Sequence, residues 1–274
     1  MKVIFFGDIM GKIGRSAVAQ ILPDWQKKYQ PDLLIANVEN LAHGKGVTKK
    51  TLQELTGLGI HMMTSGNHVW RKEDANILAK LPEFNLITPH NDPRTPAGQG
   101  YKLITINGVK IFVINLLGQE GMILIDLPDA PENNVSSPFT DIDKILELKE
   151  AKDADIILVD FHTELTSEIR AMGWHLDSRV SAVLGTHTHI PTADSQVLPQ
   201  GTGYISDIGM VGAYESVLGI AKDTIVDRFV NKSKIFFEAP DTGQAEINAV
   251  LMEIDIKSHK TIKIELLRQM VEIL

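Results

Sequence analysis

The segment Val3-Ile4-Phe5-Phe6-Gly7-Asp8 places four apolar residues in a row directly before a glycine and an aspartate. A short apolar run that ends at a turn residue is typical of a strand buried on both faces. Similar runs follow at residues 32–38 (DLLIANV) and 61–64 (HMMT), and apolar residues at helical spacing fill the intervals. This β-α-β-α-β alternation predicts a mostly parallel sheet covered by helices.

The middle and the second half of the chain contain further strand signals. Residues 155–160 (DIILVD) and 180–184 (VSAVL) again predict buried strands, and Asn107-Gly108 predicts a hairpin between 101–106 and 109–116. No linker or short repeat is visible, so we predict one domain, residues 1–274, with two packed sheets and helices outside. Further helices are predicted at 15–28, 72–81, 164–172 and 222–231, one from a Thr48 cap to near Gly57, and one that starts at Thr140. A loop is predicted at 118–138, and an antiparallel pair of strands at 247–256 and 261–267.

The composition narrows the functional classes. Hydrophobic residues make up 43% and charged residues 23% of the chain, close to the globular average. The net charge of −8 argues against an extended nucleic-acid surface, so a polyanion would be met locally, for example by bound divalent cations. The absence of cysteine excludes disulfides and thiolate metal sites. Without a signal peptide or a long apolar run, we expect a cytoplasmic protein that does not bind membranes, and a homo-oligomer is compatible with the sequence.

Polar side chains follow each of the five predicted buried strands. In open α/β sheets, ligands bind beyond the carboxyl ends of the strands, so we expect these side chains at one edge. They are Asp8 after the first strand, Glu39 and Asn40 after the second, Asn67 and His68 after the third, His162 after the fourth, and His187 and His189 after the fifth.

These residue types fit metal ions of intermediate hardness. Carboxylate, carboxamide oxygen and imidazole suit Mn, Fe or Zn. Two imidazoles at the spacing of His187 and His189 can reach two different ions from an extended loop, and Glu39 is a candidate bridging carboxylate. Two ions about 3.5–4 Å apart are the arrangement used by phosphatases and nucleases. We therefore predict two transition-metal ions per chain.

Each residue also has a simpler interpretation. Asp8 could cap a helix, Asn67 could serve only in a turn, and His162 could be a hydrogen-bonded core histidine. The occurrence of all five polar segments at strand ends favours the metal site.

His43 is a candidate substrate-binding residue. It lies in the glycine-rich loop His43-Gly44-Lys45-Gly46, four residues after Glu39, which is close enough to reach a substrate. The alternative is that the glycines only make a turn.

The same motifs resemble those of the calcineurin-like metallophosphoesterase superfamily. The segments that carry this resemblance are Gly7-Asp8, Gly66-Asn67-His68, His162 and Gly185-Thr186-His187-Thr188-His189. The segments 38–46 (VENLAHGKG), 66–70 (GNHVW) and 204–210 (YISDIGM) are similar to the YmdB-like bacterial subgroup, and this resemblance covers essentially the whole chain.

The resemblance implies an α/β fold of two packed mixed β-sheets flanked by helices, a four-layer α/β/β/α sandwich. It also implies hydrolysis of cyclic nucleotides, including 2′,3′-cyclic AMP, at a di-iron or di-manganese centre. The wider superfamily begins its motif with Asp-x-His, where this chain has Asp8-Ile9-Met10, and Glu39-Asn40 replaces its bridging Asp. Because the Glu-Asn pair is the normal form in the YmdB-like subgroup, we expect Asn40 to replace the missing imidazole; the alternative is that it caps a turn.

Together these features predict a metal-dependent phosphoric diester hydrolase. The expected substrate is a small phosphodiester, a 2′,3′- or 3′,5′-cyclic nucleotide in particular, attacked by a hydroxide that bridges the two metals. His68, next to the ligand Asn67, is the expected proton donor to the leaving group. The alternatives are an RNA phosphodiesterase, a two-metal amidase and a non-catalytic nucleotide-sensing regulator.

Overall fold

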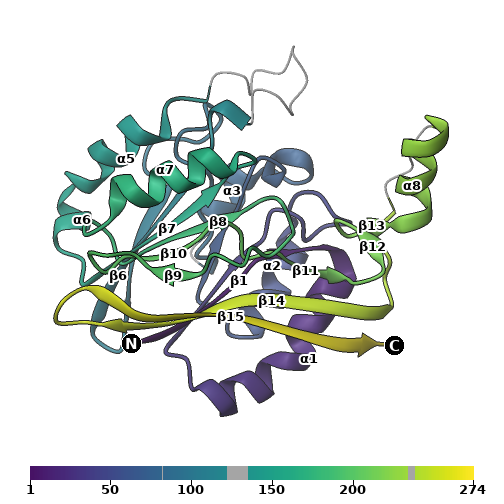
Figure 1. The fold of residues 1–274 in the computed structure, drawn as a ribbon, viewed down its shortest axis with the longest axis horizontal. Coiled ribbons are helices and arrows are strands. Elements are labelled where there is room, and N and C mark those ends of the chain that lie inside the picture. The colour runs from purple at the N-terminus through teal and green to yellow at the C-terminus, as the bar shows by residue number, and fades with distance from the viewer. Residues whose placement is uncertain (82, 122–134, 234–237) are drawn as a thin grey trace.

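The structure is a computed structural model that describes residues 1–81, 83–121, 135–233 and 238–274. The described residues form two large mixed sheets and one small sheet (Figure 1). The first sheet has the order β2 (Asp8–Ile9), β11 (Met210–Ala213), β14 (Gly243–Asp255), β1 (Lys2–Phe6), β3 (Leu33–Asn37) and β4 (Met62–Thr64), with β15 (Lys260–Ile273) paired to β14. The second has the order β5 (Tyr101–Ile106), β6 (Val109–Leu117), β7 (Ile156–His162), β8 (Ala182–Thr186), β10 (Gly203–Ile205) and β9 (Gln196–Val197). The small sheet pairs β12 (Ser216–Val217) with β13 (Ile220–Ala221).

Helices cover the outer faces of both large sheets. The described helices are α1 (Gly11–Tyr29), α2 (Lys49–Gly57), a 3₁₀ turn (Val69–Arg71), α3 (Ala75–Ala79), α5 (Pro138–Leu146), α6 (Lys149–Lys152), α7 (Thr166–Leu176) and α8 (Lys222–Asn231). None of them combines the length and hydrophobicity that a membrane span requires.

The hydrophobic clusters show the order of the layers. Phe5 of β1 packs with Val113 of β6 in the cluster between the two sheets. Its neighbour Phe6 points to the opposite face, where its ring stacks on Trp25 of α1 at 5.5 Å. Met172 of α7 belongs to a third cluster on the outer face of the second sheet. Figure 1 shows α5, α6 and α7 on one side of the sheets and α1 on the other, which confirms the predicted four-layer α/β/β/α sandwich.

Several predicted elements are confirmed. The five predicted buried strands are β1, β3, β4, β7 and β8. Asn107 and Gly108 have φ values of 51° and 82°, as a tight hairpin turn requires, and join β5 to β6. Thr48 caps α2 because its hydroxyl accepts a hydrogen bond from the backbone N of Thr51 at 3.2 Å.

Three predicted helix starts were wrong. The first helix begins at Gly11 rather than Arg15, and the residue before it, Met10, provides no side-chain cap that could mark the start. The helix predicted at 72–81 is reduced to α3, because the Asp74 carboxylate accepts from the backbone of Asn76 and caps the helix there. Helix α5 begins at Pro138, not Thr140; proline is favoured in the first turn of a helix.

Two further boundaries differ from the predictions. Helix α7 runs from Thr166 to Leu176 instead of 164–172, and β15 extends six residues past the predicted end, to Ile273 rather than Leu267. Most of the loop predicted at 118–138, residues 122–134, lies outside the described residues.

Candidate metal centre

All five polar segments lie at one edge of the two-sheet sandwich. Strands β1, β3 and β4 are parallel in the first sheet, and β7 and β8 are parallel in the second, so their carboxyl ends carry the predicted side chains. The structure brings together all of the predicted ligands and the predicted proton donor, namely Asp8, Glu39, Asn40, Asn67, His68, His162, His187 and His189.

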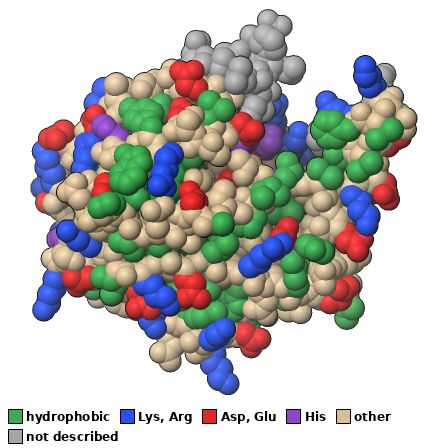
Figure 2. Space-filling view, viewed as in Figure 1, with side chains coloured by type: hydrophobic (Ala, Val, Ile, Leu, Met, Phe, Trp, Pro, Cys, Tyr) green, Lys and Arg blue, Asp and Glu red, His purple; other side chains and the backbone are tan. Residues whose placement is uncertain are grey.

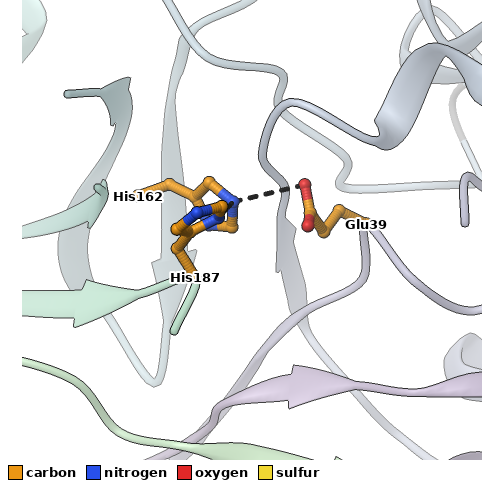
Figure 3. A group of neighbouring side chains, drawn as sticks. All are labelled: Glu39, His162 and His187. Atoms are coloured by element: carbon orange, nitrogen blue, oxygen red, sulfur yellow. Dashed lines mark hydrogen bonds and ion pairs between the residues drawn. The ribbon is translucent and has the colours of Figure 1, made fainter. Parts of the chain in front are cut away.

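The tightest part of this cluster is formed by Glu39, His162 and His187. His162 Nε2 lies 3.3 Å from Glu39 Oε2 and 3.0 Å from His187 Nδ1. One ligand atom from each residue lies within 4.8 Å of the others, and Figure 3 shows both imidazoles directed at the carboxylate. Asn67 Oδ1 lies 3.3 Å from the same nitrogen of His162. Gly66 leaves room for this contact, since a Cβ at that position would lie 2.2 Å from His162 Nε2.

Hydrogen bonds on the far side of the two loop histidines determine which ring nitrogens are unprotonated. His187 Nε2 lies 3.1 Å from Glu164 Oε2, and His189 Nδ1 lies 3.1 Å from the carbonyl oxygen of Leu218. Both oxygens can only accept, so these nitrogens carry the protons. His187 Nδ1 and His189 Nε2 therefore present lone pairs to the cluster. Burial lowers the pKa of His189 to about 4, which keeps this imidazole in the neutral form that binds metals.

His162 is oriented by a buried chain of hydrogen bonds. Its Nδ1 lies 2.9 Å from Thr186 Oγ1, and that hydroxyl donates to Asp160 Oδ1 at 2.7 Å. A hydroxyl has one hydrogen, so Thr186 accepts the Nδ1 proton of His162 and leaves Nε2 unprotonated. Asn37 also donates to Asp160, at 3.1 Å. Burial raises the pKa of Asp160 to about 7, and the hydrogen bonds from its neighbours oppose this rise because they favour the carboxylate.

Asp8 is buried with only one of its oxygens satisfied. Oδ2 accepts from the backbone N of His187 at 3.2 Å, whereas Oδ1 has no hydrogen-bond donor among the described residues. Burial, and then the charge of Glu39, raise the pKa of Asp8 well above its usual range. A buried carboxylate in this position either takes up a proton or binds a cation.

Asn40 and His68 lie on the open side of Glu39. Asn40 Nδ2 lies 3.1 Å from Glu39 Oε1 and 3.2 Å from His189 Nε2. His68 Nδ1 lies 3.1 Å from Glu39 Oε1 and 3.2 Å from Asn40 Oδ1, so it carries a proton. The His68 side chain is 27% exposed, which leaves its Nε2 as the ring nitrogen available to a substrate.

Comparison with known proteins shows the family to which this chain belongs. The sequence model of the YmdB-like protein family matches residues 4–267. This chain belongs to the YmdB-like family. A 2′,3′-cyclic-nucleotide 2′-phosphodiesterase from Bacillus subtilis (strain 168) is 39% identical over 266 residues, which cover 97% of this chain and 96% of that protein.

Solved structures agree with this membership. The crystal structure of a novel phosphatase from Mycoplasma pneumoniae has a TM-score of 0.88 at 35% identity, and the match covers 99% of this chain and 94% of that one. A calcineurin-like phosphoesterase from Bacillus subtilis has a TM-score of 0.57 at 11% identity, covering 98% of this chain and 90% of that one, which shows the shared fold. The resemblance predicted from the sequence motifs is confirmed.

A metallophosphoesterase relationship implies divalent metal ions, and the side chains of this YmdB-like protein fit them. Four atoms that carry lone pairs and no proton lie close together at the centre of the cluster. They are the unprotonated nitrogens of His162 and His187, the side-chain oxygen of Asn67 and a carboxylate oxygen of Glu39. The unsatisfied Oδ1 of Asp8 adds a further buried lone pair. Lone pairs that converge in this way repel one another unless a cation lies between them.

The loop that carries the candidate ligands His187 and His189 has an unusual backbone. The φ angle is 115° at His187 and 65° at His189, a region that side chains other than glycine rarely adopt. Asp207 supports the loop, because its carboxylate accepts from the backbone N of Thr188 at 2.8 Å and of Gly209 at 2.7 Å. Sequence reasoning used Asp207 only as part of the family motif and assigned no role to Asp160, Thr186 or Glu164.

His43 does not join the cluster. Its side chain is exposed and lines a separate cavity of about 280 Å³ together with Lys12, Arg15 and Asp241. Gly44 and Lys45 of the same loop instead line the cavity that Glu39, Asn40, His187 and His189 also line.

A cavity of about 490 Å³ opens over the cluster, within the usual range of small-molecule sites in proteins. Its polar wall includes four of the candidate ligands together with His68, Glu164 and Thr188; these four are Glu39, Asn40, His187 and His189. The opposite wall belongs to the β12–β13 hairpin and α8 and consists of Val217, Leu218, Ile220, Ile225, Arg228 and Phe229.

Proposed function

We propose that this YmdB-like protein is a phosphodiesterase that uses two metal ions. The observation that carries the proposal is the convergence of unprotonated ligand atoms from Glu39, Asn67, His162 and His187 beside the unsatisfied carboxylate oxygen of Asp8. A structural histidine cluster would share protons among its nitrogens, whereas here each proton points outward to Glu164, to Thr186 or to a carbonyl.

The proposed ligands divide into two sets that share Glu39. One set is Asp8, Glu39, Asn40 and His189, and the other is Glu39, Asn67, His162 and His187. Iron or manganese suits these donors best, and zinc also accepts them. Asn40 now directs its Nδ2 at His189 Nε2, so binding through oxygen requires a half-turn of the amide group. Two bound ions would supply a water of lowered pKa and would offset the charge of the phosphoryl group.

His68 is the group that we assign as proton donor. Its Nδ1 proton is held by Glu39 Oε1 at 3.1 Å, which orients the ring and does not depend on how the Asn40 amide is turned. When the ring is also protonated on Nε2, it can pass that proton to the leaving oxygen and keep its hydrogen bond to Glu39.

The substrate that we propose is a small nucleoside cyclic phosphate, 2′,3′- or 3′,5′-linked. The Bacillus subtilis relative, a 2′,3′-cyclic-nucleotide 2′-phosphodiesterase, supports the 2′,3′ form, and the cavity of about 490 Å³ is large enough for one nucleotide. The net charge of −8 disfavours a long nucleic acid as the main substrate.

Metal analysis followed by a substrate panel tests the proposal. Protein purified without added metal should contain about two equivalents of transition metal per chain. It should hydrolyse cyclic nucleotides and bis(p-nitrophenyl) phosphate faster than monoesters. Faster monoester turnover would overturn the diesterase assignment, and turnover of amides but not phosphate esters would indicate the amidase. Tight nucleotide binding without turnover by metal-loaded protein would indicate the regulator.

A further inference from the structure

The cavity over the metal centre has an apolar wall that the proposed hydrolysis does not use. This wall, defined above as the β12–β13 hairpin and α8, lines the same cavity as Glu39, Asn40, His187 and His189. Figure 2 shows hydrophobic side chains gathered over this part of the molecule, at the right, and a histidine in the hollow beside it. A wall of this size is unnecessary for binding a phosphate group alone, because phosphate is recognised by charge and hydrogen bonds.

The hairpin is fixed to the metal centre at two points. The carbonyl oxygen of Leu218 accepts the proton of the ligand His189, at 3.1 Å. Met10, two residues after the ligand Asp8, packs with Ile220 and Ile225 in a small hydrophobic cluster. The position at which the wider superfamily has a histidine is therefore used here to support the apolar wall. The distance between the metal centre and the wall is set by these contacts rather than left to a free loop.

Helix α8 presents two different stripes of side chains. Ile225, Arg228 and Phe229 have the spacing of one helix face, and all three line the cavity. Val226 and Val230 form the neighbouring stripe, which is 53% and 72% exposed and does not line it. Because Phe229 of the cavity stripe and Val230 of the other stripe are both exposed, Val230 offers a matched control for Phe229.

The cavity stripe combines an available ring with an available cation. Phe229 is 78% exposed although it lines the cavity, so a flat ligand can reach its ring. Arg228 has no ion-pair partner in the described part of the chain, so its guanidinium can donate to a ligand. Flat heteroaromatic groups stack on such rings, and their edge nitrogens and oxygens accept from arginine.

We infer that this wall is the nucleobase subsite of the enzyme. With the cyclic phosphate at the metal ligands, the sugar carries the base across the cavity, where its face stacks on Phe229 and its edge accepts from Arg228. The inference rests on the proposed function for the phosphate end of the substrate and adds what selects a nucleoside over other cyclic diesters.

The test compares a substrate with a base and one without. Wild type, Phe229→Ala and the control Val230→Ala are loaded with metal and assayed on 2′,3′-cyclic AMP and on glycerol 1,2-cyclic phosphate. Removal of the ring on which the base stacks is expected to raise KM for cyclic AMP in Phe229→Ala by about 5- to 150-fold. KM for the glycerol substrate should stay at the wild-type value, and Val230→Ala should match wild type on both. Arg228→Ala should likewise affect only the nucleotide.

Other outcomes would overturn the subsite or the proposed function separately. Unchanged KM for cyclic AMP in Phe229→Ala, or an equal change for both substrates, would overturn the subsite alone. An equal loss in Val230→Ala would show that α8 acts through another contact, such as a second copy of the chain. If metal-loaded wild type hydrolyses neither substrate, the proposed function fails and the subsite with it.

Discussion

The metal centre and the α8 wall meet in one cavity but are built in different ways. The ligands stand at the ends of β1, β3, β4, β7 and β8, are almost all buried, and each histidine is held by a second group behind it. The wall stands on a two-stranded hairpin and one helix and leaves Phe229 largely exposed. In our proposal the chemistry therefore rests on the two sheets, whereas the selection of the substrate rests on a peripheral element. Changes in the centre should therefore affect every diester, and changes in the wall only those with a base.

Removal of metal is expected to have the largest effect on turnover, and the effect should be the same for substrates with and without a base. A chelator should reduce turnover of both cyclic AMP and glycerol 1,2-cyclic phosphate to background, because Asp8, Glu39 and the histidines cannot replace a cation. Turnover of the two substrates is followed before chelation, after it, and after manganese or iron is added back. Full activity in metal-free protein would contradict the assignment of the whole centre.

Asn40→Ala is expected to cause the second-largest loss of turnover. Loss of this ligand weakens the set formed by Asp8 and His189, while the set formed by Asn67, His162 and His187 keeps its ion. With limiting metal, turnover should approach that of chelated protein, and excess metal should restore part of it. Metal content is counted after desalting. Two ions held as tightly as in wild type would show that Asn40 is not a ligand.

His68→Ala should retain both metals and lower turnover by about 10²–10⁴-fold, the usual contribution of one acid–base group. Bis(p-nitrophenyl) phosphate has a good leaving group that needs little protonation, so it should lose less than cyclic AMP. Equal losses on both substrates would rule out the proton-donor role.

Thr186→Val should give the smallest of these effects within the metal centre. The change breaks the chain from His162 through Thr186 to Asp160 and is expected to weaken metal binding by about 10- to 100-fold. Thr186→Ser keeps the hydroxyl and should restore affinity, measured by competition with a chelator of known strength. If valine binds metal as serine does, the hydroxyl does not orient His162.

Much of the centre could be predicted because each ligand directly follows a buried strand. The apolar runs that end at Phe6, Val38 and Thr64 are visible in the sequence, and parallel strands bring their ends to one edge. The chain from His162 to Asp160 could not be predicted, since it depends on the register that sets His162 opposite Thr186 in neighbouring strands.

The placement of His43 was equally beyond sequence reasoning. His43 is four residues from Glu39, but Gly44 and Gly46 have φ values of 81° and 78° and turn the loop, so Lys45 rather than His43 lines the cavity. The α8 wall gave no signal either, because its role depends on where the hairpin places a helix that looks ordinary in the sequence. The single domain over residues 1–274, the cytoplasmic location and a homo-oligomer stay predictions.

The origin of the ligands in both sheets has a mechanical consequence. Asp8, Glu39 and Asn67 belong to the first sheet and His162 and His187 to the second, so ions bound between them would cross-link the two layers. A chain without cysteine has no disulfide available, and a metal bridge of this kind would take its place. Separation of the layers and release of the ions would then be one event, so that metal retention would report whether the sandwich is closed.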